Sequence, residues 1–137
     1  MIKARIISAL AFALAACGQE AAESASEAPE VITGEVIARG VFEGASDHVT
    51  TGGVTIRKGA DGYYVTLEED FSLDGAPDPK LGFGNPDYAA ETQFSALKSK
   101  TGYQSYKLPE GFDPTGYQTI YVWCEQFSVP LGVATLG

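Results

Sequence analysis

The sequence predicts one small all-β domain, a β-sandwich or barrel-like fold built from short antiparallel strands. First, β-branched and aromatic residues recur in short runs of period two from residue 31 onward. Second, Gly, Pro and Asp interrupt these runs every few residues. Third, no helical spacing of three and four persists for three turns after the N-terminal segment. The roughly 105 residues that follow this segment suit a single domain.

The clearest local element is a hairpin. Apolar and polar residues alternate over residues 54–57, and residues 63–67 form a run of aromatic and β-branched side chains. Residues 58–62 between them end in Asp-Gly, a typical turn sequence. We therefore expect two adjacent antiparallel strands here, preceded by a first strand within residues 31–42.

The remaining elements are short. Pro79 and Lys80 interrupt the run before Leu81, which predicts a sheet edge or a bulge at that point. Alanines at 89 and 90 with Glu91 favour a single helical turn. The other expected segments are a loop at 75–79, short strands at 94–97 and 104–108, a turn at 111–116, and final strands at 117–124 and 127–136.

The N-terminus has the layout of a secretory signal, assigned to residues 1–16. Lys3 and Arg5 precede an apolar run, residues 6–16, that is far shorter than the ~20 residues of a membrane span. Its ending, L-A-A-C, resembles the lipobox of bacterial lipoproteins, which implies cleavage before Cys17 and lipid attachment to that cysteine. The alternative is an ordinary signal peptidase site that leaves Cys17 as a free thiol.

Residues 17–31 have the composition of a flexible acidic tether, and residues 32–137 form the predicted β domain. The tether contains four glutamates and too few apolar residues to offset the entropy of ordering it. We expect the protein to be held at the cell envelope by lipid on Cys17, facing the periplasm or the exterior. The sequence does not distinguish the inner membrane from the outer.

Charge excludes one class of partner. Seven basic residues and all eighteen acidic residues follow position 16, which gives the mature chain a formal charge of −11. Phosphate contacts need clustered Lys and Arg, so nucleic acid is not an expected partner. The expected partners are the membrane and an unidentified redox protein.

Two stretches carry a family resemblance. They are G-Y-Q-S-Y-K-L-P at residues 102–109 and V-W-C-x-x-F at residues 122–127. Their order and spacing resemble the DM-thirteen domain, an extracytoplasmic module found in bacterial lipoproteins, across roughly residues 35–136. The resemblance implies electron transfer through Cys124, either as a bare thiol or as the ligand of a prosthetic group such as haem.

Cys124 has two interpretations. If Cys17 is lipidated, Cys124 has no disulfide partner within an exported chain, which favours a redox role. However, strand alternation places it on an apolar face with Ile120 and Val122, where a free cysteine often packs as a small hydrophobic residue. A reactive thiolate needs a positive neighbour, and the candidates are His48, Lys98 and Lys107.

The sequence offers few side chains that could bind a cofactor or a metal. His48 is the only histidine and therefore the only imidazole that could accompany Cys124 in a haem or ligand site. It could equally be a loop residue whose ring bonds nearby backbone. No C-x-x-C-H motif is present, and one Cys with one His falls short of a zinc site. The acidic cluster could supply calcium ligands or form a solvated turn; its members are Glu68, Glu69, Asp70, Asp74 and Asp78.

Two functions follow from these observations. The first is an extracytoplasmic, lipid-anchored redox or electron-transfer module that acts through Cys124. The alternative is a non-catalytic binding or scaffold domain of the cell envelope in which Cys124 only packs. No complete catalytic constellation is present, so the sequence does not decide whether the protein is an enzyme.

Overall fold

The computed structural model describes residues 34–137, which form eleven strands and two short 3₁₀ turns. The strands are β1 (Glu35–Gly44), β2 (Thr50–Thr51), β3 (Gly53–Gly59), β4 (Gly62–Leu67), β5 (Ser72–Leu73), β6 (Pro79–Gly84), β7 (Tyr88–Ala89), β8 (Ser95–Ala96), β9 (Gln104–Lys107), β10 (Thr119–Cys124) and β11 (Val129–Thr135). The 3₁₀ turns are η2 (Ala90–Thr92) and η3 (Pro114–Gly116). The predicted all-β class is confirmed.

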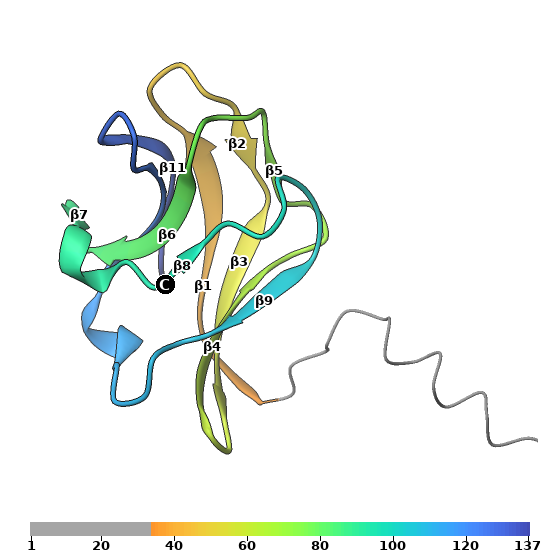
Figure 1. The fold of residues 1–137 in the computed structure, drawn as a ribbon. Helices are drawn as coiled ribbons and strands as arrows, with labels where there is room; N and C mark the ends of the chain where they lie inside the picture. Colours follow the sequence, from red (N-terminus) through yellow and green to blue (C-terminus); the bar gives the residue numbers. More distant parts are fainter. Residues whose placement is uncertain (1–33) are drawn as a thin grey trace, which may run out of the picture.

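Nine strands form one antiparallel sheet in the order β7-β6-β10-β11-β1-β3-β4-β9, with β8 also paired to β6. The sheet curls into a half-barrel, and β2 and β5 form a separate two-stranded ribbon (Figure 1). The long strand β1 joins the two halves because its first part pairs with β3 and its last residues pair with β11. The sandwich or barrel-like architecture expected from the sequence therefore takes the form of a curled sheet.

The hairpin of β3 and β4 is confirmed in register, with Val54 opposite Leu67 and Gly59 opposite Gly62. Gly62 has a φ of 139°, a conformation that side-chain-bearing residues rarely adopt, so the Asp-Gly turn depends on this glycine. The expected strands at the C-terminal end are also present, as β10 and β11. The helical turn expected at residues 89–91 is the 3₁₀ turn η2.

The edge or bulge expected at Pro79 is wrong. Pro79 is the first residue of β6, and it pairs with Cys124 of β10 in an unbroken register that runs to Gly84. The other side of β6 is occupied by β7 and β8. A proline is tolerated at the first position of a strand, and its carbonyl still accepts a hydrogen bond from Leu97 N at 2.9 Å.

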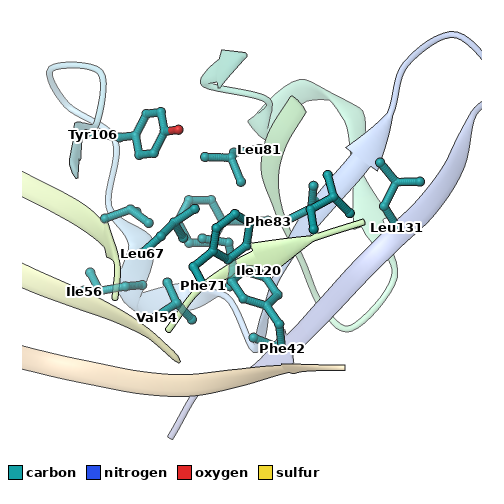
Figure 2. Close-up of a cluster of buried hydrophobic side chains, with 14 of the residues drawn as sticks. Phe42, Val54, Ile56, Leu67, Phe71, Leu81, Phe83, Tyr106, Ile120 and Leu131 are labelled. Atoms are coloured by element: carbon teal, nitrogen blue, oxygen red, sulfur yellow. The ribbon is translucent and has the colours of Figure 1, made fainter. Parts of the chain in front are cut away.

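The concave side of the curled sheet holds the core, drawn in Figure 2. The three rings around Phe83 are Phe94, Phe112 and Tyr117, each with its centroid 5.3–5.5 Å from that of Phe83. Next to the two-stranded ribbon of β2 and β5, the ring of Phe71 packs edge to face against that of Phe42, with ring centroids 5.6 Å apart. Such contacts add to the burial of apolar area, which is the main stabilising contribution in a domain of this size.

The predicted signal peptide, Cys17 and the whole acidic tether, residues 17–31, lie outside the described residues. Within residues 34–137, no helix is long and apolar enough to cross a membrane.

Candidate functional site

Cys124 is the last residue of β10, a strand with neighbours on both sides. It lies opposite Pro79 of β6 and Val129 of β11. The register of β10 and β11 shifts beside it, since Val122 pairs with Gly132 whereas Trp123 pairs with Pro130. This irregularity accommodates a proline within β11, because Pro130 has no N–H to donate to the ladder. The cysteine therefore lies at the irregular end of the central strand pair.

The sulfur of Cys124 is buried beneath a loop. The residue is 1% exposed and belongs to the hydrophobic core, on the same face as Ile120 and Val122 as strand alternation predicted. Its Sγ donates a hydrogen bond to the carbonyl oxygen of Pro77, 3.2 Å away. This bond requires the thiol form, since a thiolate has no proton to donate. Cys124 is a free cysteine, so no disulfide uses its sulfur.

Pro77 belongs to residues 74–79, which we call the cover segment. Its first residue, Asp74, is fixed from outside by the loop before β2. His48 Nδ1 lies 3.0 Å from Asp74 Oδ1, and the backbone N–H of Val49 donates to Oδ2 at 3.0 Å. The bond from Val49, assisted by His48, holds the pKa of the Asp74 carboxyl below its usual range. The cover segment is thus anchored at Asp74, three residues before Pro77, whose carbonyl accepts the bond from the Cys124 thiol.

The other end of the cover segment is held by Asp78. Its carbonyl accepts from Glu125 N at 3.2 Å, and its carboxylate pairs with Lys80 Nζ at 3.1 Å. Asp78 has a φ of 52° and Gly75 a φ of 123°, so the segment bends sharply at both places. The sequence predicted a loop here but gave no sign that the loop covers the cysteine.

The three candidate cationic partners of Cys124 each contact another group. His48 binds Asp74, so it shares the cover segment with Cys124 without touching the sulfur. Lys98 Nζ donates to the Ser105 carbonyl at 2.5 Å and lies 4.6 Å from the ring centroid of Tyr106. Lys107 Nζ pairs with Asp61 at 3.1 Å. No contact that would activate a thiolate joins any of these three groups to the sulfur.

A haem ligated by Cys124 does not fit this arrangement. The sulfur is bonded to a backbone carbonyl within a packed core, and haem needs an adjacent cavity large enough for the macrocycle. A hollow of about 500 Å³ is lined by residues of β1, β3 and β11 with Glu68, and neither Cys124 nor His48 is among them. Among residues 34–137, no three Cys, His, Asp or Glu side chains are grouped as metal ligands.

The acidic residues considered for calcium are dispersed among other partners. Glu68 accepts from the Thr55 hydroxyl at 2.9 Å, and Asp70 accepts from the backbone N–H of Gly53 at 2.9 Å. Asp74 and Asp78 hold the cover segment. Each of these four carboxylates therefore has a protein partner of its own.

The G-Y-Q-S-Y-K-L-P stretch has a structural role. The Gln104 amide accepts from Ser99 N at 3.1 Å and from the Tyr106 hydroxyl at 2.5 Å, and it donates to the carbonyls of Ser99 and Gly102. Burial raises the pKa of Tyr106 to about 12, so the phenol keeps its proton and stays a donor even in alkaline solution. This buried polar network closes the loop between β8 and β9.

Comparison with known proteins agrees with the motifs. The family model described as Electron transfer DM13 matches residues 42–136, close to the span of the resemblance found in the sequence. Searches of curated proteins and of solved structures returned no match. The match covers β10, the cover segment and the G-Y-Q-S-Y-K-L-P stretch.

Proposed function

The chain belongs to the electron-transfer DM13 family, and from this premise we propose that it is a redox module whose reacting atom is Cys124 Sγ. The observation that carries the proposal is the free thiol at the end of β10, inside the matched region. As the only cysteine of the folded domain, it is the natural candidate for thiol redox chemistry there.

The reaction that suits a single thiol is exchange with a disulfide on a partner protein. Cys124 loses its proton to water, and Sγ attacks one sulfur of the partner's disulfide. The partner's S–S bond breaks as the new mixed S–S bond forms, and the departing thiolate takes up a proton. A thiol of a dithiol donor protein then attacks Cys124 Sγ, which releases the partner with both of its cysteines reduced. The donor's second thiol displaces Cys124 and closes the donor's disulfide, so two electrons and two protons pass from the donor to the partner and Cys124 is a thiol again.

Burial of the sulfur means that this chemistry requires residues 75–78 of the cover segment to move while Pro79 stays paired in β6. Local openings of loops cost less free energy than global unfolding. The ties of the cover segment are polar contacts at Asp74 and Asp78 together with packing of Ala76 against the core. Displacing Pro77 removes the hydrogen bond to Sγ without breaking the ladder between β10 and β6. The proposed active form is therefore the native sheet with an open cover.

Thiol labelling against denaturant concentration tests this proposal. The mature chain carrying Cys17→Ser leaves Cys124 as the single thiol, and its reaction with a disulfide reagent is followed from zero to moderate urea. Opening of the cover alone exposes little surface, so the labelling rate will be nearly independent of urea. The matched control is Cys124→Ser on the same background, which must show no labelling.

The opposite result would support the alternative function. A labelling rate that rises with urea as steeply as global unfolding would mean that only the unfolded chain reacts. The burial of Cys124 at 1% exposure favours this alternative, a binding or scaffold domain in which the sulfur only packs. The urea dependence separates the two functions without knowledge of the natural partner.

We further propose that lipid on Cys17 anchors this module at the cell envelope, facing the periplasm or the exterior. The L-A-A-C ending and the acidic stretch that follows it support this placement. An anchored module would meet its redox partner on or near the membrane surface.

A further inference from the structure

Three aromatic rings gather on the outer face of the sheet, directly behind Cys124. Tyr88 of β7 stacks on Trp123 of β10 with centroids 4.0 Å apart and planes at 12°. Tyr121 meets both rings edge to face, at 5.5 Å from Tyr88 and 6.2 Å from Trp123. We call these three residues the aromatic face. Trp123 is the immediate chain neighbour of Cys124, so the face lies one residue from the sulfur.

The local backbone makes room for these rings. A Cβ atom at Gly82 would lie 2.6 Å from Cε2 of Tyr88, so only glycine permits the ring to lie over β6. Gln93 fixes the edge by donating from Nε2 to the Tyr88 hydroxyl at 3.1 Å and to Glu125 Oε2 at 2.8 Å. Tyr88 and Trp123 remain half-buried, so part of each ring faces solvent. The rings of the aromatic face are therefore fixed in position, and part of their surface is accessible to a partner.

Carboxylates surround the aromatic face. Burial raises the pKa of the Tyr88 hydroxyl, and the charges of Glu125 and Glu91 raise it further. Burial also raises the pKa of Tyr121, with a contribution from Asp87. The one cation beside Trp123 in the ladder is Lys80, and its ammonium is paired with Asp78 at 3.1 Å. The rim of the face is consequently negative.

We propose that the aromatic face is the docking surface for a positively charged electron-carrier protein. This inference rests on the proposed redox function, because it concerns where a redox partner docks; the sulfur itself is reached from the other side of the sheet, through the opened cover segment. An apolar aromatic centre with a charged rim is typical of a protein interface, and small charge-steered contacts are typical of electron-transfer encounters. A carrier seated on Trp123 would lie close to the sulfur without entering the core.

Nuclear magnetic resonance of the mature Cys17→Ser chain tests the proposal, with oxidised cytochrome c as the lysine-rich probe. Trp123 is the only tryptophan, so its indole N–H gives one assignable signal at the centre of the face. We expect cytochrome c to shift this signal and the amides of Tyr88 and Tyr121 at low salt, with loss of the shifts at high salt. Tyr88→Ala should weaken binding at least tenfold, the effect expected of an interface anchor.

Two matched controls keep the test specific. Phe127→Ala removes an aromatic ring that is 62% exposed on the turn between β10 and β11, and it should leave the affinity unchanged. Glu125→Gln with Asp87→Asn should weaken binding and flatten its salt dependence, whereas Glu110→Gln should do neither, because Glu110 acts on Lys107 instead.

Three results would overturn the proposal. They are shifts that map away from the aromatic face, affinity that is indifferent to salt, and saturable binding of a neutral chitin oligosaccharide with none of cytochrome c. The last result would identify the face as a glycan platform. Cys124→Ser should bind cytochrome c as tightly as the parent, because the sulfur lies on the other side of the sheet. Docking can therefore succeed or fail independently of the thiol chemistry.

Discussion

Replacing Cys124 with alanine measures how much the buried sulfur contributes to stability. The substitution removes one heavy atom from a core position that is 1% exposed, together with a hydrogen bond to the Pro77 carbonyl. Lost burial and the small cavity cost about 1 kcal/mol. The bond from a weak thiol donor adds about 0.5 kcal/mol, since water can reach the exposed Pro77 after the change. We expect a total loss of about 1.5 kcal/mol.

Serine provides the matched comparison. Its hydroxyl can still donate to the Pro77 carbonyl, but a more strongly hydrated atom then replaces sulfur in an apolar site. We expect Cys124→Ser to cost about 1 kcal/mol. For a domain of this size, a loss of 1 kcal/mol lowers the melting temperature by roughly 4–8 °C, so both variants should melt measurably earlier than the parent.

Urea unfolding followed by Trp123 fluorescence provides the assay, because this single tryptophan lies beside the substituted position. Both variants should shift the midpoint to lower urea without changing the slope, since the same surface is exposed on unfolding. A neutral or stabilising effect of Cys124→Ala would refute the packing argument. Such a result would mean that the native site is strained and is retained for its chemistry, the usual trade between stability and activity.

Four further outcomes are expected. Cys17→Ala should abolish membrane association, which fractionation would show; a variant that still pellets with membranes would exclude the lipid anchor. Asp74→Asn should speed native labelling of Cys124 because it weakens the tie to His48. The pKa of Asp74 is lowered in the folded protein, so the bond between Asp74 and His48 is complete above the ordinary aspartate value of 3.8 and is lost as pH falls through the lower folded value. Labelling of the parent protein, corrected for the pH dependence of the reagent itself, should therefore accelerate only in acid. Gly82→Ala should displace Tyr88 and change Trp123 fluorescence, whereas Gly116→Ala, which meets open space, should not.

Much of the fold could be predicted because its determinants are local. The alternation of residues 54–57 and 63–67 and the Asp-Gly turn between them specify the hairpin without reference to the rest of the chain. The alternation of β10 likewise predicted that Ile120, Val122 and Cys124 face the core, where all three are buried. The error at Pro79 arose because a strand's neighbours depend on pairings distant in sequence, and a first-position proline leaves both neighbours possible.

The surroundings of the site could not be predicted, because they join segments distant in the chain. Pro77 meets Cys124 across 47 positions, and His48 meets Asp74 across 26. No local pattern encodes such contacts. The sequence placed Trp123 opposite the core, but its stacking on Tyr88 depends on β7 folding back along β6. Gly82 of β6, which pairs with Tyr121, was a local sign that a side chain packs over β6, because glycine leaves the space that the Tyr88 ring occupies.

Burial of Cys124 and membership of an electron-transfer family are compatible if access to the sulfur is controlled from outside the sheet. The sulfur side is closed by residues 74–79, whose ties at Asp74 and Asp78 lie at the surface, and the opposite side is open at the aromatic face. Opening of the cover leaves β10 in place, because β6 and β11 hold this strand over its whole length. A thiol that is inert until the cover opens would avoid unwanted oxidation, and under the proposed envelope location this advantage gives a physical reason for a redox cysteine to be buried.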